Sequence, residues 1–525
     1  MAARAIKFVL QIGAVAVVLA ALPYKLFELD RYFVPKELVL HVVALVVGAL
    51  LLARRRATPF DLVDKLIAVF LVWSFVSALF ATNYWLAQRA LGLSVSSAIV
   101  FWGARAVAED GRYRGLLAGC ALASVVVAAT CLAQAYGLET EYFSANRAPG
   151  GTLGNRNFVA HIAVIGLPSL VWCTLTARRS VYTFAGSFGV AIVAAALVLS
   201  RSRAAWLAVA ASVVLLFFPM LASRKYWSGK QIGGRFARLV LAAVIGAIIA
   251  IVMPNSLNWN SESPYLDSAR AMVDYKKGSG RGRLAQYENS LQMSVRHPIF
   301  GVGPGNWPVE YVLFAPRDDR SLTVEGTTAN PWPSSDWVSF MSERGFVPAV
   351  AMLTVFGALF LGSLRRWRDL EDGDAVLAQI VLAGTIASTM VVSAFDVALL
   401  LAAPALLIWS VLGATSGIRR KSIIEPVPTQ RTWSIGVIGA MLILMCSVVR
   451  STTQTISMAT VGRGGRTAGW VAGSAWDPGS YRISLKVAQF YMRRGRCATV
   501  RVYARRASHL FPHAREPKRL SESCG

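Results

Sequence analysis

The chain has 525 residues, of which 55% are hydrophobic and only 16% are charged. Together with a mean hydropathy of +0.50, this excludes an ordinary soluble globular domain, in which about 25% of residues are charged. The formal net charge is +26, which in a soluble protein would suggest nucleic-acid binding. In a membrane protein, Lys and Arg gather instead in cytoplasmic loops, so we expect no nucleic-acid partner.

Apolar runs of about 17–25 residues recur along the chain, the length that a helix needs to cross about 30 Å of hydrocarbon. We therefore predict an all-α, polytopic membrane protein with about 13 transmembrane helices. The first run follows MAARAIK and is interpreted as a retained helix, because no small-residue cleavage site leads from it into a soluble domain. The predicted spans are centred near Val15, Ala44, Val72, Ser96, Ser124, Ile165, Ile192, Ser212, Ile245, Thr354, Gly384, Ala402 and Ala440.

Every second loop is rich in Lys and Arg, and the positive-inside rule places these loops and the N-terminus in the cytoplasm. The basic loops lie at 54–56, 105–114, 178–179, 224–238, 365–368 and 419–431. The alternate loops then face outward, at 24–36, 83–89, 137–157, 200–203, 254–343 and 393–396. With an odd number of spans, the end of the chain faces outward too.

Two regions of the chain are polar. The first, called the island, is the large outward loop 254–343 between the ninth and tenth spans, within the predicted membrane domain (1–450). The second is the tail (451–525). The tail resembles one tetratricopeptide-type helical hairpin, with small residues at helix-packing spacing at Ala488, Ala504 and Ala507. One such unit buries little apolar surface, so we expect it to dock on a partner, such as an envelope-assembly protein.

The tail also holds two cysteines, Cys497 and Cys524. In an oxidising compartment they can form a disulfide that closes the hairpin. The alternative is two free thiols, and the sequence leaves both open.

The outward loops collect arginine, asparagine and glycine. Arginine's planar fork pairs bidentately with phosphate oxygens, although arginines at span ends also anchor helices by snorkelling. The candidate binding residues are Arg147, Asn155, Asn157, Arg201, Arg203, Arg281 and Arg283. The histidines have no metal-ligand spacing, and GVGPGNW follows no predicted strand, so neither a metal nor a dinucleotide cofactor is predicted.

Four motifs of these loops follow one another along the chain. They are GTLGNRNFVAHIAVIGLPSL (151–170), SRAAWLA (202–208), RLAQYENSLQMSVRHPIFGVGPGNW (283–307) and SDWVSFMSERG (335–345). In this order they resemble the O-antigen ligase and polymerase superfamily over residues 151–417, roughly half of the chain. Tyr287 stands where tryptophan is common in the family.

The resemblance implies an all-helical glycosyltransferase of the bacterial inner membrane, with the island and the tail in the periplasm. Such enzymes transfer a glycan from undecaprenyl diphosphate to an acceptor hydroxyl, without a nucleotide sugar, a metal or another cofactor. The acceptor is lipid A-core in ligases, the next repeat unit in polymerases, or a protein in O-oligosaccharyltransferases. Arg203 and Arg283 match the family's essential arginines, whose implied role is to bind the diphosphate and stabilise charge on the leaving group.

The chain departs from the family at one important position. The family's histidine, a candidate base for the acceptor hydroxyl, falls at Ser334, and serine at its ordinary pKa cannot act as a base near pH 7. Asp336 and His297 are candidate substitutes. The alternatives are a helix N-cap for Asp336 and a surface residue before a turn proline for His297, while Glu343 matches a family position that is more plausibly structural.

Two functions of other classes stay open. A transporter of lipid-linked glycans would be expected to show two similar halves with broken helices, and no such repeat is seen. A non-catalytic scaffold of an envelope polysaccharide machine is favoured by Ser334 and by the tail. The tail also favours a partner or a protein acceptor over a plain lipopolysaccharide ligase.

Overall fold

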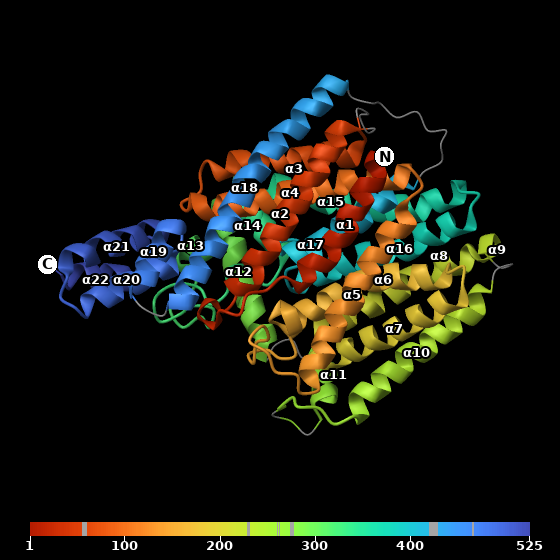
Figure 1. Cartoon of the computed structure of the whole chain (residues 1–525), viewed down its shortest axis with the longest axis horizontal. Helices are drawn as coiled ribbons and strands as arrows, with labels where there is room; N and C mark the ends of the chain where they lie inside the picture. Colours follow the sequence, from red (N-terminus) through yellow and green to blue (C-terminus); the bar gives the residue numbers. More distant parts are fainter. Residues whose placement is uncertain are drawn as a thin grey trace.

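The computed structural model of the protein consists of α-helices joined mostly by short loops (Figure 1). It describes residues 1–54, 60–227, 231–259, 261, 263–273, 278–418, 429–464 and 467–524, and within these residues no β-strand is formed. The helices are α1 (Ala2–Leu19), α2 (Asp30–Ala53), α3 (Leu62–Ala78), α4 (Tyr84–Glu109), α5 (Tyr113–Ala135), α6 (Arg156–Leu175), α7 (Ser180–Ser200), α8 (Arg203–Ala222), α9 (Arg224–Trp227), α10 (Ile232–Val252), α11 (Pro264–Val273), α12 (Gly278–Arg296), α13 (Trp307–Glu310), α14 (Asp336–Arg344), α15 (Phe346–Arg366), α16 (Gly373–Phe395), α17 (Ala402–Gly417), α18 (Gln430–Gly464), α19 (Thr467–Trp476), α20 (Tyr481–Met492), α21 (Cys497–Leu510) and α22 (Arg515–Glu522).

Among the described residues, eleven helices are long and apolar enough to span a membrane. They are α1, α2, α4, α5, α6, α7, α8, α10, α15, α16 and α18. The two remaining predicted centres, Val72 and Ala402, fall on α3 and at the start of α17, which have 17 and 16 residues. Every predicted centre therefore lies on a helix, and the all-α, polytopic fold is confirmed.

The helices differ in how far other helices cover them. The span of α16 is 89% buried inside the protein, and those of α4 and α6 are 78% buried. The spans of α8 and α10 are only 17% buried and expose large apolar side chains such as Phe218 and Ile248. Apolar side chains on such a surface suit contact with lipid hydrocarbon, so α4, α6, α16 and α17 form the centre and α8 and α10 the rim.

Contacts between loops show which of them lie at the same end of the helix bundle. At one end, Arg114 pairs with Asp374 (2.9 Å) and Arg235 donates to the carbonyl oxygen of Leu175 (2.7 Å). These residues belong to, or adjoin, the predicted basic loops. Parts of three of those loops, at 55–56, 228–230 and 419–428, lie outside the described residues.

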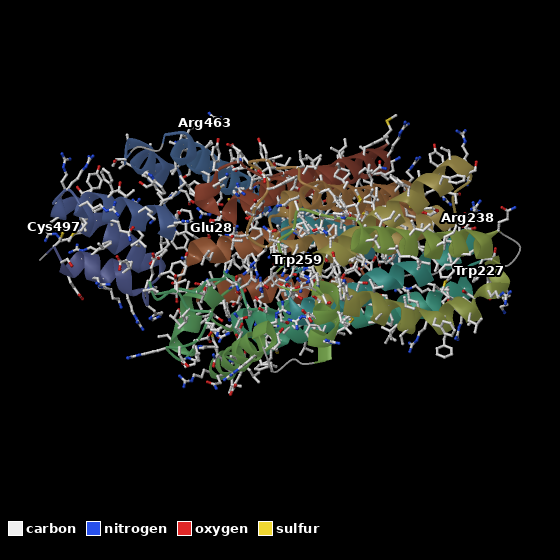
Figure 2. The ribbon with its side chains drawn as sticks, turned by 90° about the horizontal axis from the view of Figure 1, so that it is seen from below. Glu28, Trp227, Arg238, Trp259, Arg463 and Cys497 are labelled. Carbon is white, nitrogen blue, oxygen red and sulfur yellow. A yellow bond between two sulfur atoms is a disulfide. The ribbon has the colours of Figure 1, made fainter. Side chains whose placement is uncertain are left out.

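The opposite end brings together the predicted outward loops. Arg31 donates to the carbonyl oxygen of Glu141 (2.7 Å), and the Asn83 backbone N–H donates to the side chain of Asn306 (2.7 Å). The island and the tail also lie here, which we call the island end. Figure 2 shows the separation, with Cys497 far from Arg238, the last residue of the predicted basic loop 224–238, which lies on α10. Alternate loops thus share one end, as the alternation of charge predicts.

The tail is held at the island end by helix α18 and by contacts with the membrane domain. Helix α18 has 35 residues, about 52 Å of helix, and runs unbroken through the predicted boundary between 450 and 451. An apolar cluster joins tail residues to the segment before and within α2: Phe27, Val34, Met458, Val461, Ile483 and Val487. The Asn83 side chain also donates to the carbonyl oxygen of Leu510 (3.0 Å). One face of the tail is therefore docked within the molecule.

Cys497 and Cys524 form a disulfide in the tail, with Cα atoms 5.2 Å apart. It links the first residue of α21 to the segment just after α22. The predicted tetratricopeptide character of the tail stays a prediction.

Candidate functional site

The turn between α16 and α17 is held in place by Asp336, the first residue of α14. Its fully buried carboxylate accepts hydrogen bonds from the backbone N–H groups of Ala398 (2.8 Å), Leu399 (3.0 Å) and Leu400 (3.2 Å). Burial raises the pKa of Asp336 to about 6, against the opposing effect of these hydrogen bonds. Because both oxygens are occupied, the geometry suits a structural clamp better than a free base. Ser335, rather than Asp336, occupies the N-cap of α14.

Asp396, at the end of α16, gathers residues from two other helices. One of its carboxylate oxygens accepts a hydrogen bond from Asn157 (3.3 Å) and lies 3.7 Å from a guanidinium nitrogen of Arg283. The same oxygen lies 3.8 Å from Nε2 of His161, which is fully buried one turn after Asn157 on α6. We call these four residues the Asp396 cluster. It unites two predicted site residues, Asn157 and Arg283, around an aspartate that the sequence did not single out.

Arg203 begins α8, which packs antiparallel to α16. The hydroxyl groups of Ser212 and Ser388 lie 2.9 Å apart and fix the register of the two helices. Arg203 precedes Ser212 by nine residues, and Asp396 follows Ser388 by eight. Both therefore lie about 12–14 Å along the helices from this contact. This register places Arg203 at the same level as the Asp396 cluster.

One face of α12 points toward the same turn. Arg283, Gln286 and Tyr287 share that face because residues three and four apart are neighbours on a helix. The Tyr287 hydroxyl lies 2.7 Å from the carbonyl oxygen of Ser334 and 3.0 Å from that of Ala394. The Ser334 hydroxyl donates to the side-chain oxygen of Gln286 (2.8 Å). Ser334, where the family carries histidine, is thus bonded to α12 one turn from Arg283.

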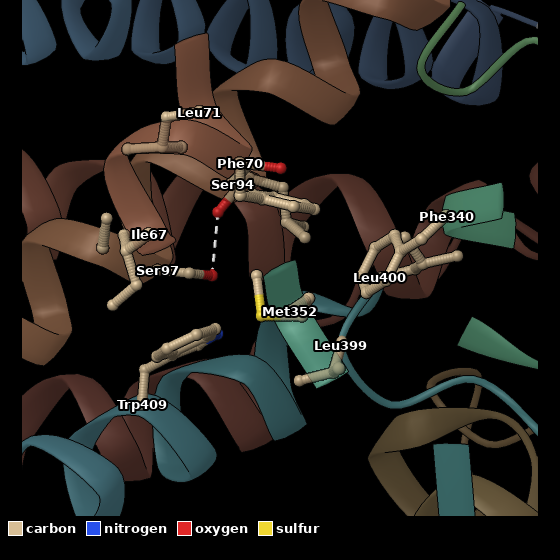
Figure 3. Close-up of a pocket in the computed structure, with 12 residues that line it drawn as sticks. Ile67, Phe70, Leu71, Ser94, Ser97, Phe340, Met352, Leu399, Leu400 and Trp409 are labelled. Carbon is tan, nitrogen blue, oxygen red and sulfur yellow. Dashed lines mark hydrogen bonds between the residues drawn. The ribbon is translucent and has the colours of Figure 1, made fainter. Parts of the chain in front are cut away.

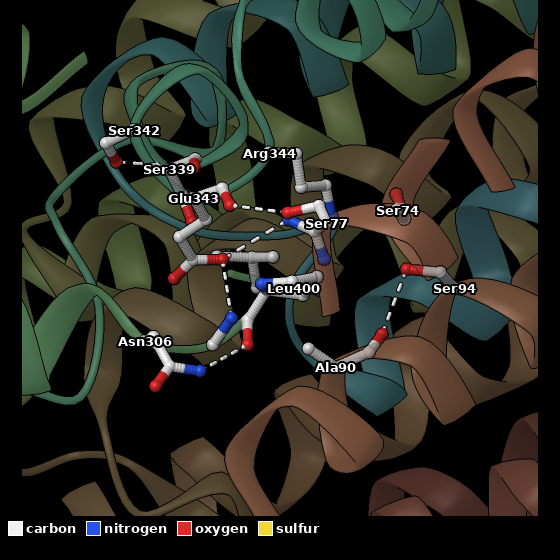
Figure 4. A network of polar contacts seen from close by, with 12 residues as sticks. Ser74, Ser77, Ala90, Ser94, Asn306, Ser339, Ser342, Glu343, Arg344 and Leu400 are labelled. Carbon is white, nitrogen blue, oxygen red and sulfur yellow. Dashed lines mark hydrogen bonds and ion pairs between the residues drawn. The ribbon is translucent and has the colours of Figure 1, made fainter. Parts of the chain in front are cut away.

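The GVGPGNW motif contacts the C-terminal end of α14. Figure 4 shows the polar network there, with Asn306 of the motif and Glu343 and Arg344 of α14. The backbone N–H of Gly303 donates to the carbonyl oxygen of Glu343 (2.8 Å), and that of Gly305 to the Glu343 carboxylate (2.9 Å). Gly301 has φ +61°, and a Cβ there would lie 2.2 Å from the carbonyl carbon of Glu343. The glycines permit close backbone approach. Burial raises the pKa of Glu343, opposed by Arg344 3.2 Å away, an arrangement that suits a structural role.

A second group of arginines surrounds Trp259, in the segment between α10 and α11. The guanidinium carbons of Arg156 and Arg201 lie 5.2 and 4.6 Å from the Trp259 ring centroid, within cation–π range. Arg201 also donates to the hydroxyl of Ser268 (2.8 Å). The carbonyl oxygen of Arg147 accepts the backbone N–H of Arg156 (3.0 Å).

Arg147 and Arg201 have φ angles of 60° and 52°, and no other non-glycine residue of the described chain lies in the left-handed region. The left-handed conformation costs about 1–2 kcal/mol for a residue with a side chain. Such strain persists where the surrounding structure over-determines it, and it clusters at functional sites. Both strained residues belong to the predicted binding set.

Three other predicted residues lie outside these clusters. Asn155 is buried and caps α6, its side chain accepting the backbone N–H of Asn157 (3.0 Å). Arg281 is exposed and lies two residues, about 200°, from Arg283 around α12, so it faces away from the Asp396 cluster. His297 is exposed directly after α12.

An apolar pocket lies between α3, α4, α14, α15 and α17 (Figure 3). Its twelve lining residues are apolar or serine, and the hydroxyl of Ser97 is already bonded to its own helix at Leu93 (2.9 Å). Such a lining suits hydrocarbon and disfavours a charged group. None of the predicted site residues lines it, so the chemistry is expected at the Asp396 cluster instead.

Sequence reasoning missed Asp396, His161, Arg156 and Trp259. A signal existed for two of them, because a polar or ionisable residue inside or at the end of an apolar span is a functional hypothesis by default. His161 lies within a span, and Asp396 directly follows one. The roles of Arg156 and Trp259 depend on segments about 100 residues apart, which the sequence does not show to be in contact.

Residues 188–353, from α7 to α15, match the protein family described as O-antigen ligase. The matched region contains Arg203, Arg283, Ser334 and Asp336. A comparison with curated proteins gives no match. The family match supports a ligase- or polymerase-like role in building cell-envelope polysaccharide, with membrane glycosyltransferase-like activity. The chain therefore carries an O-antigen ligase domain at residues 188–353.

Proposed function

We propose that the protein transfers a glycan from undecaprenyl diphosphate to an acceptor hydroxyl at its island end, on the periplasmic side of the bacterial inner membrane. The observation that carries this proposal is that Arg283 lies beside Asp396 and that Arg203 lies at the same level of the helix bundle, at its island end. Guanidinium groups suit diphosphate oxygens. The family match supports the same reaction class.

In the proposed reaction, the acceptor oxygen attacks the anomeric carbon of the glycan. The bond between that carbon and the diphosphate oxygen breaks, and undecaprenyl diphosphate leaves with the electron pair. Arg203 and Arg283 stabilise the negative charge that develops on the leaving group. Removing one preorganised contact of this kind costs about 2.7–4 kcal/mol of transition-state stabilisation.

The acceptor hydroxyl must also lose its proton. Ser334 does not suit this step, because its hydroxyl donates to Gln286 and has no basic form near pH 7. The Asp336 carboxylate is fully buried and occupied by the turn. Asp396 is 9% exposed and lies beside Arg283, so it is the carboxylate best placed to accept the proton. Diphosphate binding to Arg283 would free the Asp396 oxygen that now faces it.

A deletion strain complemented with variants tests the proposal. We expect the wild-type chain to restore the mature surface glycan, and Arg283→Ala to accumulate lipid-linked donor instead. Arg296→Ala is the matched control, because Arg296 lies on α12, is exposed and stacks on Phe314 (5.2 Å) away from the Asp396 cluster. Full restoration by Arg283→Ala at equal protein level would reject the transfer reaction and favour a scaffold.

The glycan profile of the deletion strain also identifies the acceptor. Loss of capped lipopolysaccharide indicates a ligase, and single repeat units indicate a polymerase. Loss of a glycoprotein indicates a protein O-oligosaccharyltransferase. The envelope-assembly partner proposed for the tail would bind the face of the tail that is not docked on the membrane domain.

A further inference from the structure

At the island end, residues that are neighbours in sequence have side chains in two separate clusters. At the start of α6, Asn157 reaches Asp396 while Arg156, the preceding residue, stacks on Trp259. Arg201 also stacks on Trp259, two residues before Arg203 opens α8. The arginines around Trp259 therefore lie beside the Asp396 cluster without belonging to it.

The Trp259 cluster, which consists of Trp259 with Arg147, Arg156 and Arg201, concentrates positive charge. Arg147 and Arg201 both repel the charge of Arg156. Among the described residues, the carboxylate that acts on Arg201 is that of Asp267, and one of its oxygens already accepts the Ser261 hydroxyl (2.5 Å). Like charges at close range destabilise one another, so packing alone does not account for three arginines at this point.

The geometry leaves these cations usable by a ligand. A guanidinium stacked over a ring keeps its N–H groups at its edge, where they can meet an oxyanion in a bidentate pair. Arg147 is exposed, and Arg156 and Arg201 are half-buried, so solutes can reach all three. Arg147 and Arg201 also retain the left-handed backbone.

We propose that Arg156 and Arg201, stacked on Trp259, and Arg147, which adjoins Arg156, form a second oxyanion site that binds an acidic group of the glycan, such as a carboxylate, sulfate or phosphate substituent. The oxyanion chemistry follows from the three arginines. That the glycan carries the group rests on the proposed function, since a donor bound at the Asp396 cluster would extend over the neighbouring cluster. The site thus selects acidic glycans.

Binding to the full-length protein in neutral-lipid nanodiscs tests this site. The probes are an oligogalacturonate, a neutral oligosaccharide of equal length and inorganic pyrophosphate, and tryptophan fluorescence is the signal. Trp259→Phe identifies the part of the signal that comes from Trp259. We expect the oligogalacturonate and pyrophosphate to change it, and the neutral sugar to leave it unchanged.

Arg156→Gln and Arg201→Gln should each weaken oligogalacturonate binding by about 10- to 100-fold, the loss of one charge-assisted pair. Arg156→Lys should weaken it less. Arg296→Gln, which removes an exposed arginine stacked on another ring, should leave it unchanged. Thermal unfolding of every variant verifies that it is folded.

Two results would overturn the proposal: oligogalacturonate binding that is insensitive to Arg156→Gln and Arg201→Gln, or a Trp259 signal that neither oligogalacturonate nor pyrophosphate changes. A response to pyrophosphate alone would assign the site to a phosphate substituent. Failure of the proposed function is distinguishable, because it would appear as absent transfer while oxyanion binding at Trp259 persists in both the wild type and Arg283→Ala.

Discussion

Replacing Asp336 with alanine separates a structural role from a catalytic one. The Asp336 carboxylate accepts three backbone N–H groups of the α16–α17 turn at 2.8–3.2 Å. Alanine leaves these donors without an acceptor, and a buried unsatisfied group costs about 1–3 kcal/mol. Allowing for relaxation of the turn, we expect the free energy of unfolding to fall by about 3–5 kcal/mol, as when one partner of a buried charged network is lost. Asp336→Asn keeps one carbonyl oxygen and should lose about 1–2 kcal/mol.

The free energy of unfolding is measured by titrating the purified protein with a denaturing detergent, and glycan transfer is measured on the same samples. Glu522→Ala, which removes an exposed carboxylate, is the control and should change stability by less than about 0.5 kcal/mol. A loss below about 1 kcal/mol for Asp336→Ala would refute the clamp. The clamp would also be refuted if Asp336→Asn kept the stability of the wild type but lowered the rate of glycan transfer by about 100- to 10,000-fold, because that is the signature of a missing general base.

Three further predictions address the fold. Between its ordinary pKa of 3.8 and its raised pKa of about 6, Asp336 holds its proton more tightly in the folded protein. The bound proton therefore adds about 3 kcal/mol of stability below pH 3.8, beyond what the clamp contributes, and this increment is lost as pH rises through 6. The free energy of unfolding of the wild type relative to Asp336→Ala should fall by that amount over this window; a flat difference would contradict it. Gly301→Ala should lose about 2–5 kcal/mol of stability from strain and overlap, whereas Gly282→Ala, whose Cβ meets open space, should gain up to about 1 kcal/mol; equal thermal shifts would refute the close-approach argument. Cys497→Ser opens a cross-link of 27 positions and should lose about 3–4 kcal/mol within the tail, seen as faster proteolysis of α20–α22; unchanged proteolysis would show that the disulfide adds no stability.

The spans were predictable because each apolar run is long enough to cross the hydrocarbon. The arrangement of the spans was not. Helices α16 and α8 have similar hydropathy, 2.0 and 2.3, yet their spans are 89% and 17% buried. Hydropathy measures compatibility with an apolar environment, and both lipid and a protein core provide one. Only tertiary packing separates the two.

The candidate site was predictable in part. Arg283 and Asn157 stood out because arginine and asparagine were concentrated in the outward loops. The sequence pointed to Asp336 because it lies two residues from Ser334, but in the fold its oxygens face a turn about 60 residues away. Asp396, which meets Arg283, belongs to another loop. The structural role of the GVGPGNW motif likewise depends on its close approach to the end of α14, which the sequence does not show.

The most direct test of the central claim is transfer by the purified protein in proteoliposomes supplied with undecaprenyl-diphosphate-linked glycan and an acceptor. The measured quantities are glycan on the acceptor and undecaprenyl diphosphate released. We predict that the wild type releases one carrier for each glycan transferred, and that Arg283→Ala lowers the rate by about 100- to 1,000-fold. Absence of carrier release by the wild type, or an unchanged rate in Arg283→Ala, would contradict the claim.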